Sequence, residues 1–185
     1  GYAGWNLLDV ERVIAMLNQT GSRRIIKLRK GIRVNKVYDK IIFITQTPTQ
    51  TSFFYVLESV PTVVRVGENN TAYSFELLDI RDFNPEPGTL YLDYAKLSLP
   101  LVVRNRLPGD HFYPQGMEGR KKLKDYFIDR KIPYFLRDKI PLLSSPSANR
   151  VWAILDEGRI DKAVAVNNST RQILVIKKSN IVKNN

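Results

Sequence analysis

Residues 101–133 read LVVRNRLPGDHFYPQGMEGRKKLKDYFIDRKIP, and this stretch places a strand, a tight turn and a helical pattern in succession. The apolar run Leu101–Arg104 predicts a strand. The motif Leu107-Pro108-Gly109-Asp110 predicts a type II turn, because proline presets φ at its second position and glycine accepts a positive φ at its third. We therefore expect the chain to reverse sharply before the helical part.

Residues 119–131 have the period of a helix with a strongly basic start. Leu123, Tyr126, Phe127 and Arg130 fall on one face, and Pro133 ends the pattern. The spacing favours a core role for the two aromatic rings, with stacking on RNA bases as the alternative. Four cations lie in or next to the first turn: Arg120, Lys121, Lys122 and Lys124. The helix macrodipole favours the opposite charge there, so folding alone does not explain the cations, whereas a bound phosphate does.

Outside this stretch the chain is mostly a series of short β-like runs. One helix is expected near the start, capped by Asn6 or Asp9, with apolar residues at helical spacing: Val10, Val13, Ile14 and Leu17. Strands are expected at residues 24–28, 32–37, 41–45, 53–58, 63–66, 72–78, 89–94, 151–155, 163–166 and 172–176. The pattern predicts an α+β fold of two small domains, each a mostly antiparallel sheet with one or two short helices. We expect residues 1–98 to form the first domain and 99–185 the second, because acidic character ends near residues 97–100.

Composition excludes several kinds of chemistry. The chain has no Cys and one His, so it offers no disulfide, no thiolate metal site and no Cys nucleophile. No glycine-rich nucleotide-binding loop occurs, and we read the carboxylates as helix and turn residues rather than as an acid–base pair. No apolar run is long enough to span a membrane, and the first residues do not resemble a signal peptide. We therefore expect a cytoplasmic protein without a membrane contact, metal or cofactor of its own, cut from a longer chain.

The net charge of +11 is concentrated in two blocks. Residues 22–40 carry eight Lys and Arg against one Asp, and residues 104–139 carry ten against five Asp and Glu. The intervening residues 46–103 carry three Lys and Arg against seven Asp and Glu. A generally basic surface is one explanation, but clustered cations are what a phosphate-binding surface requires.

Three motifs in the second block carry a family resemblance. They are Arg104-Asn105-Arg106-Leu107-Pro108-Gly109-Asp110, Pro114-Gln115-Gly116-Met117, and residues 121–133, followed by Arg137-Asp138-Lys139-Ile140-Pro141-Leu142-Leu143 and Trp152. In this order they resemble the C-terminal domain of bacterial tRNA(Ile)-lysidine synthetase over roughly residues 97–178. Upstream, Leu28-x-x-Gly31-x-x-Val34 is similar to the preceding subdomain of the same enzymes. The chain departs from the pattern at His111, where the family usually has a basic residue, and in the lengthened segment 153–161 after Trp152.

The resemblance implies a parent enzyme that uses ATP and Mg²⁺ to attach lysine to the wobble cytidine of a tRNA(Ile) with anticodon CAU. The family's catalytic ATP loop is missing here, so this fragment is expected to bind the tRNA body, chiefly the acceptor stem, and to do no chemistry itself. The expected RNA contacts are the cations of the second block: Arg104, Arg106, Arg120, Lys121, Lys122, Lys124, Arg130, Lys131 and Arg137. The alternatives are a protein–protein or dimerisation module, including a homodimer, and a self-contained enzyme.

Overall fold

The computed structural model describes residues 6–21, 23–45, 52–67 and 71–180, and the chain divides into two compact units. Unit 1 is Gly1–Thr49 and unit 2 is Gln50–Asn185. The expected boundary at residues 98/99 falls inside unit 2. A strand before that point, Phe54–Leu57, pairs with Leu101–Arg104 after it, so one sheet spans the expected boundary.

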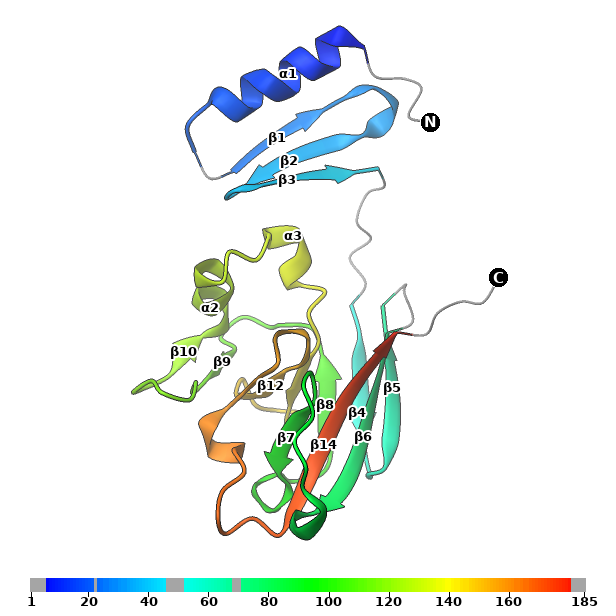
Figure 1. Ribbon diagram of the computed structural model, residues 1–185, viewed down its shortest axis with the longest axis vertical. Coiled ribbons are helices and arrows are strands. Elements are labelled where there is room, and N and C mark those ends of the chain that lie inside the picture. The colour runs from blue at the N-terminus through cyan, green and yellow to red at the C-terminus, as the bar shows by residue number, and fades with distance from the viewer. Residues whose placement is uncertain (1–5, 22, 46–51, 68–70, 181–185) are drawn as a thin grey trace, which may run out of the picture. The chain divides into compact units, whose positions relative to one another are not determined.

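Unit 1 is one helix on a three-stranded antiparallel sheet (Figure 1, blue). Its elements are α1 (Leu7–Asn18), β1 (Arg23–Lys27), β2 (Arg33–Val37) and β3 (Lys40–Ile44). Asn6 caps α1, because its side chain accepts a hydrogen bond from the Asp9 amide at 2.9 Å. The buried face of α1 carries Val13 and Met16, which pack with Leu28 and Val34. Two residues of the expected apolar stripe, Val10 and Ile14, are exposed instead.

Unit 2 is built on two antiparallel sheets. The strands of the five-stranded sheet, in spatial order, are β13 (Arg159–Ile160), β12 (Val151–Ile154), β11 (Leu142–Ser144), β8 (Leu101–Arg104) and β4 (Phe54–Leu57). The four-stranded sheet runs β5 (Thr62–Val66), β6 (Thr71–Asp79), β14 (Gln172–Asn180) and β7 (Leu90–Asp93). The expected α+β class with mostly antiparallel sheets and few short helices is confirmed.

The five-stranded sheet is covered on both faces. Leu143 and Ala153 lie in a core shared with the four-stranded sheet, where Phe75 and Leu174 are fully buried. Their chain neighbours, such as Leu142, point to the other face. Successive side chains of a strand alternate between faces, so a strand covered on both sides reads as a continuous apolar run.

The layer over the second face holds the candidate site. It consists of a two-stranded ribbon, β9 (His111–Phe112) and β10 (Lys121–Lys122), the helix α2 (Leu123–Asp129) and the short helix α3 (Tyr134–Arg137) (Figure 1, green to yellow). Leu123, Tyr126 and Phe127 of α2 pack on Phe112 and on the sheet. The core role expected for the aromatic rings of α2 is therefore confirmed.

Several local predictions differ from the structure. The expected strand at residues 163–166 is a 3₁₀ turn (Lys162–Val164) followed by extended chain. Helix α2 begins at Leu123, because residues 121–122 pair with β9 instead of joining the helix. Strands β9, β10, β11 and β13 and helix α3 were not predicted.

Candidate nucleic-acid interface

The site is organised by the turn Leu107-Pro108-Gly109-Asp110 between β8 and β9. The Asp110 amide donates to the carbonyl of Leu107 at 3.2 Å, and Gly109 has φ +88°, so the predicted type II turn is confirmed. The Asp110 carboxylate turns inward and accepts from the Leu107 amide at 2.7 Å. The Leu123 amide donates to the Asp110 carbonyl at 2.9 Å. The turn thus holds the start of α2 in place.

Arg104 does not belong to the binding surface. Its side chain is 3% exposed and forms a two-pronged ion pair with Asp110, at 2.8 and 2.9 Å. It also donates to the carbonyls of Asn105 and Ala148. The structure therefore gives no support to the expected RNA contact of Arg104, because its guanidinium is occupied inside the protein. A basic residue in a charged sequence motif does not reveal that it faces a buried carboxylate.

The two neighbouring lysines of β10 point in different directions. Lys121 forms an ion pair with Asp129 at the end of α2, with Nζ 2.5 Å from Oδ2. Lys122 lines the pocket described below. This separation follows from the strand conformation of residues 121–122, in which successive side chains point to opposite faces.

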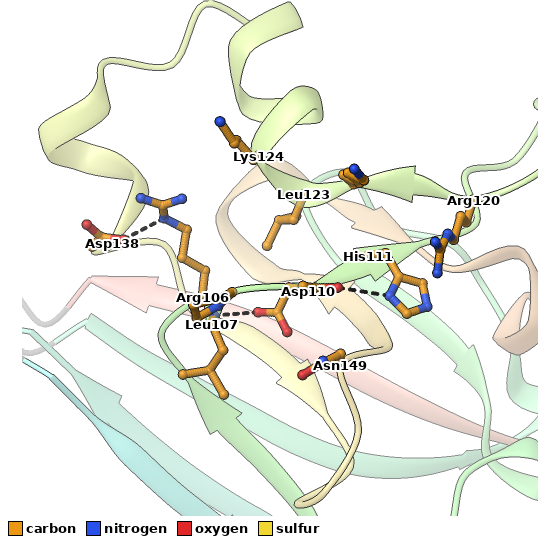
Figure 2. Close-up of a pocket in the computed structure, with 12 residues that line it drawn as sticks. Arg106, Leu107, Asp110, His111, Arg120, Leu123, Lys124, Asp138 and Asn149 are labelled. Carbon is orange, nitrogen blue, oxygen red and sulfur yellow. Dashed lines mark hydrogen bonds and ion pairs between the residues drawn. The ribbon is translucent and has the colours of Figure 1, made fainter.

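Four of the nine expected RNA contacts converge on one pocket of about 760 Å³. They are Arg106, Arg120, Lys122 and Lys124. Figure 2 shows the pocket-lining side chains arriving from the turn, the ribbon and the first turn of α2. Within the described part of the chain, the side chains of Arg120, Lys122 and Lys124 make no hydrogen bond or ion pair. These three exposed cations are therefore uncompensated, and an anion in the pocket would relieve their mutual repulsion.

Four further polar residues line this pocket and were not predicted as contacts: Asp110, His111, Asp138 and Asn149. Asp138 accepts from the Arg106 Nε at 2.5 Å, which fixes the guanidinium at the pocket wall. His111 has Nδ1 3.1 Å from the Gly109 carbonyl, so this nitrogen is directed at the turn. The sequence resemblance had marked His111 only as a departure from the family pattern.

The other expected contacts lie away from this pocket. Arg130 is paired with Glu157 at 3.6 Å, and Arg137 donates from Nε to the Ile132 carbonyl at 2.9 Å. Lys131 is exposed, with a left-handed φ of +54° just after α2. Near Arg130, burial raises the pKa of Tyr126, and the negative charge of Glu157 raises it further. Lys121, Arg130, Lys131 and Arg137 therefore form no single cluster with the pocket cations.

The region that holds the pocket is also the region that matches a known protein family. Residues 101–173, which include the turn, the ribbon and α2, match the family model for the TilS substrate C-terminal domain. This part of the chain is therefore a TilS C-terminal domain. A solved structure described as the crystal structure of a TilS C-terminal domain aligns with a TM-score of 0.57 and 27% identity. The alignment covers 70% of this chain and 99% of that one.

Several curated relatives are longer proteins, and this chain matches only part of their length. A tRNA(Ile)-lysidine synthase of Caldanaerobacter subterraneus subsp. tengcongensis is 34% identical over 170 residues, which is 90% of this chain and 35% of the relative. A synthase of the same name from Parabacteroides distasonis is 42% identical over 86 residues, covering 46% of this chain and 19% of the relative. A bifunctional protein TilS/HprT of Listeria monocytogenes is 32% identical over 145 residues, or 77% of this chain and 22% of the relative. The chain thus spans about a third or less of these relatives.

In this TilS C-terminal domain, the lengthened segment after Trp152 has a defined path. A 3₁₀ turn, Leu155–Glu157, ends at Gly158 in the left-handed conformation with φ +61°, and β13 then returns to the sheet. Asp156 accepts a hydrogen bond from the Tyr73 hydroxyl at 2.6 Å. It also forms an ion pair with Lys178. The insertion is therefore tied to the four-stranded sheet.

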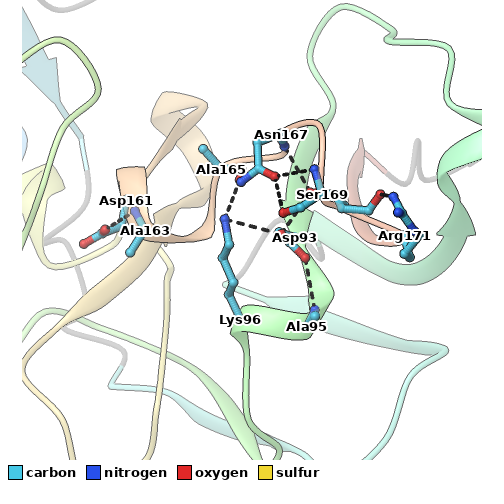
Figure 3. A network of polar contacts seen from close by, with 10 residues as sticks. Asp93, Ala95, Lys96, Asp161, Ala163, Ala165, Asn167, Ser169 and Arg171 are labelled. Atoms are coloured by element: carbon cyan, nitrogen blue, oxygen red, sulfur yellow. Dashed lines mark hydrogen bonds and ion pairs between the residues drawn. The ribbon is translucent and has the colours of Figure 1, made fainter.

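A second polar cluster of the TilS domain is structural. The buried carboxylate of Asp93 accepts from the Thr170 hydroxyl at 2.9 Å and lies 3.3 Å from the Lys96 ammonium (Figure 3). Asp161, also buried, holds Arg150 at 2.8 Å, and the Arg150 guanidinium lies over Tyr113. Every one of these charges has a partner, as a cluster that anchors loops requires.

The described residues contain no group of three or more His, Cys, Asp or Glu placed to hold a metal ion. Among the same residues no helix is long and apolar enough to cross a membrane.

Proposed function

We propose that this chain is the tRNA-recognition region of a tRNA(Ile)-lysidine synthase and that its pocket cations grip the acceptor stem. The observation that carries the proposal is the set of uncompensated cations, Arg120, Lys122 and Lys124, gathered around one pocket of the TilS domain. Phosphate contacts of this kind supply most of the affinity for nucleic acid, and duplex RNA is read through its backbone and minor groove.

The chemistry belongs, in this proposal, to the part of the parent enzyme outside this chain. There, ATP with Mg²⁺ activates the wobble cytidine of tRNA(Ile) with anticodon CAU, and lysine replaces the activating group. This chain positions the substrate and catalyses no step. The parent acts in the cytoplasm, where its tRNA is found.

The test is the salt dependence of tRNA binding by the full 185-residue chain. If about six phosphates are contacted, a plot of log affinity against log salt has a slope of about −5. Fluorescence anisotropy with labelled tRNA(Ile) at several salt concentrations measures it. A slope near zero, or no binding at low salt, contradicts the proposal.

A second candidate function is a protein-binding or homodimer module, and the edge strand β4 favours it. Phe54 and Val56 of this strand are 56% and 48% exposed. Exposed apolar edges of a sheet pair readily with other chains. Size-exclusion chromatography with and without tRNA separates the two functions: a dimer that forms alone and ignores tRNA supports this candidate.

A further inference from the structure

The charge balance of the pocket suits an anion of more than one charge. Of its two carboxylates, Asp110 is neutralised by buried Arg104, and Asp138 is paired with Arg106. Among the described residues, the side chains of Arg120, Lys122 and Lys124, which also line the pocket, have no ion-pair or hydrogen-bond partner. A phosphodiester inside an RNA strand carries one negative charge, whereas a terminal phosphate monoester carries about 1.5 to 2 at pH 7. Three free cations at one place therefore stabilise a chain end more than a backbone phosphate.

The shape of the pocket also suits a chain end. Its volume of about 760 Å³ lies in the range of about 300 to 1,000 Å³ typical of small-molecule sites. A phosphate within a duplex is flanked by a nucleotide on each side, so it meets a surface or groove more readily than a pocket. A terminal phosphate brings only one nucleotide with it.

An apolar wall stands beside these cations. Leu107 and Pro108 form the exposed part of the turn that lines the pocket, and Leu107 is 51% exposed. The last base pair of a duplex has one flat face exposed to water. Contact with an apolar surface stabilises that face, as stacking stabilises bases on aromatic side chains. Base pairs inside the duplex are already covered by their neighbours.

We propose that this pocket receives the 5′-terminal phosphate monoester of the bound RNA, with the last base pair against the Leu107–Pro108 turn. The proposal rests on the proposed function, since it names the part of the tRNA that the site holds. In it, Arg120, Lys122 and Lys124 bind the phosphate, and Asp138 positions Arg106 at its edge.

The experiment compares two tRNA(Ile) molecules that differ only at the 5′ end, one with a monophosphate and one dephosphorylated to a hydroxyl. Affinity for the full chain is measured at one salt concentration. We expect the hydroxyl form to bind about tenfold more weakly, because the charge-assisted hydrogen bonds of the monoester are lost. The double variant Arg120→Ala with Lys122→Ala should bind both RNAs with nearly equal affinity.

The matched control is Lys131→Ala, which removes an exposed cation outside the pocket. It should lower both affinities together and keep the tenfold difference. Circular dichroism confirms that each variant is folded. Equal affinity of the unaltered chain for the two RNAs overturns the 5′-phosphate proposal and leaves tRNA binding intact, whereas no binding of either RNA overturns the proposed function itself.

Discussion

Arg104 and Asp110 form a buried ion pair whose loss should destabilise unit 2. In Arg104→Met, Asp110 keeps its place at the turn but loses its cation, which costs about 3–5 kcal/mol of the free energy of unfolding. Chemical denaturation measures this loss. The matched control Arg120→Met removes an exposed cation and should change the same free energy by less than about 0.5 kcal/mol. An Arg104→Met variant as stable as the control would contradict the structural role of this pair.

Gly109 is a second residue whose replacement is informative, because two constraints meet there. Its φ is +88°, and a Cβ would lie 3.0 Å from the Asn149 Nδ2. Gly116 has a similar φ of +75° but no atom within 4 Å of the added Cβ, so Gly116→Ala is the matched control. The left-handed conformation alone costs about 1–2 kcal/mol in either variant.

Gly109→Ala should therefore lower the melting temperature further than Gly116→Ala, and it should also weaken tRNA binding, since Gly109 lines the pocket. Differential scanning calorimetry and anisotropy measure the two effects. Equal losses in both variants would mean that the Asn149 side chain moves aside without cost.

At the scale of elements, the β10 strand separates the roles of two adjacent lysines. Lys122→Ala should weaken tRNA binding by about threefold to tenfold at unchanged melting temperature, because an exposed phosphate contact is lost. Lys121→Ala should leave binding almost unchanged and cost at most about 1 kcal/mol of stability, the usual range for a surface ion pair such as Lys121–Asp129. Anisotropy and thermal melting of both variants test this. A stronger binding loss in Lys121→Ala would show that its pair with Asp129 opens to reach the RNA.

The sequence predicted elements best where local pattern decides them. The turn at Pro108-Gly109 and the buried face of α2 followed from residue type and spacing, and both are present. The β9–β10 ribbon was missed because Lys121 and Lys122 have a helical pattern in the sequence, and their partner strand lies across the loop of residues 113–120. Strand β11 was missed for a related reason, since it is short and its place between β8 and β12 depends on pairing with distant residues.

The sequence predicted which basic residues belong to the candidate site better than it predicted how they are arranged. The basic stretch contains the pocket cations, as charge clustering indicated. Charge clustering cannot separate Arg104, which neutralises a buried carboxylate, from Arg120, which faces solvent, because burial depends on the whole sheet. His111 and Asn149 reach the pocket only through the pairing of distant segments, so no local pattern marks them.

At the scale of the whole molecule, the positive charge is distributed unequally between the units. Unit 1 has nine Lys and Arg against three Asp and Glu in 49 residues, whereas unit 2 has twenty against fifteen in 136. Unit 1 therefore carries more than half of the net charge of +11 in about a quarter of the chain. If tRNA contacts both units, replacing cations of unit 1 by neutral residues should make the slope of log affinity against log salt less steep. The preference of the pocket for a 5′-phosphate should stay the same.

The two units should also differ in stability, because each has its own core. Among the described residues, the core cluster of unit 1 has four buried apolar residues, whereas the larger core cluster of unit 2 has fifteen. Small domains bury a smaller fraction of their surface, so unit 1 should open at a lower free energy than unit 2. Native-state hydrogen exchange should show weaker protection of the amides in β1–β3 than of those in β6 and β14.

A matched pair of core variants tests whether the units open separately. Met16→Ala in unit 1 and Leu174→Ala in unit 2 each remove a buried side chain and cost about 2–5 kcal/mol. If the units are independent, Met16→Ala lowers protection in β1–β3 and leaves β6 and β14 unchanged, because its cavity lies in the core cluster of unit 1. A loss of protection that spreads equally through both units in either variant would instead show that the chain opens as one cooperative body.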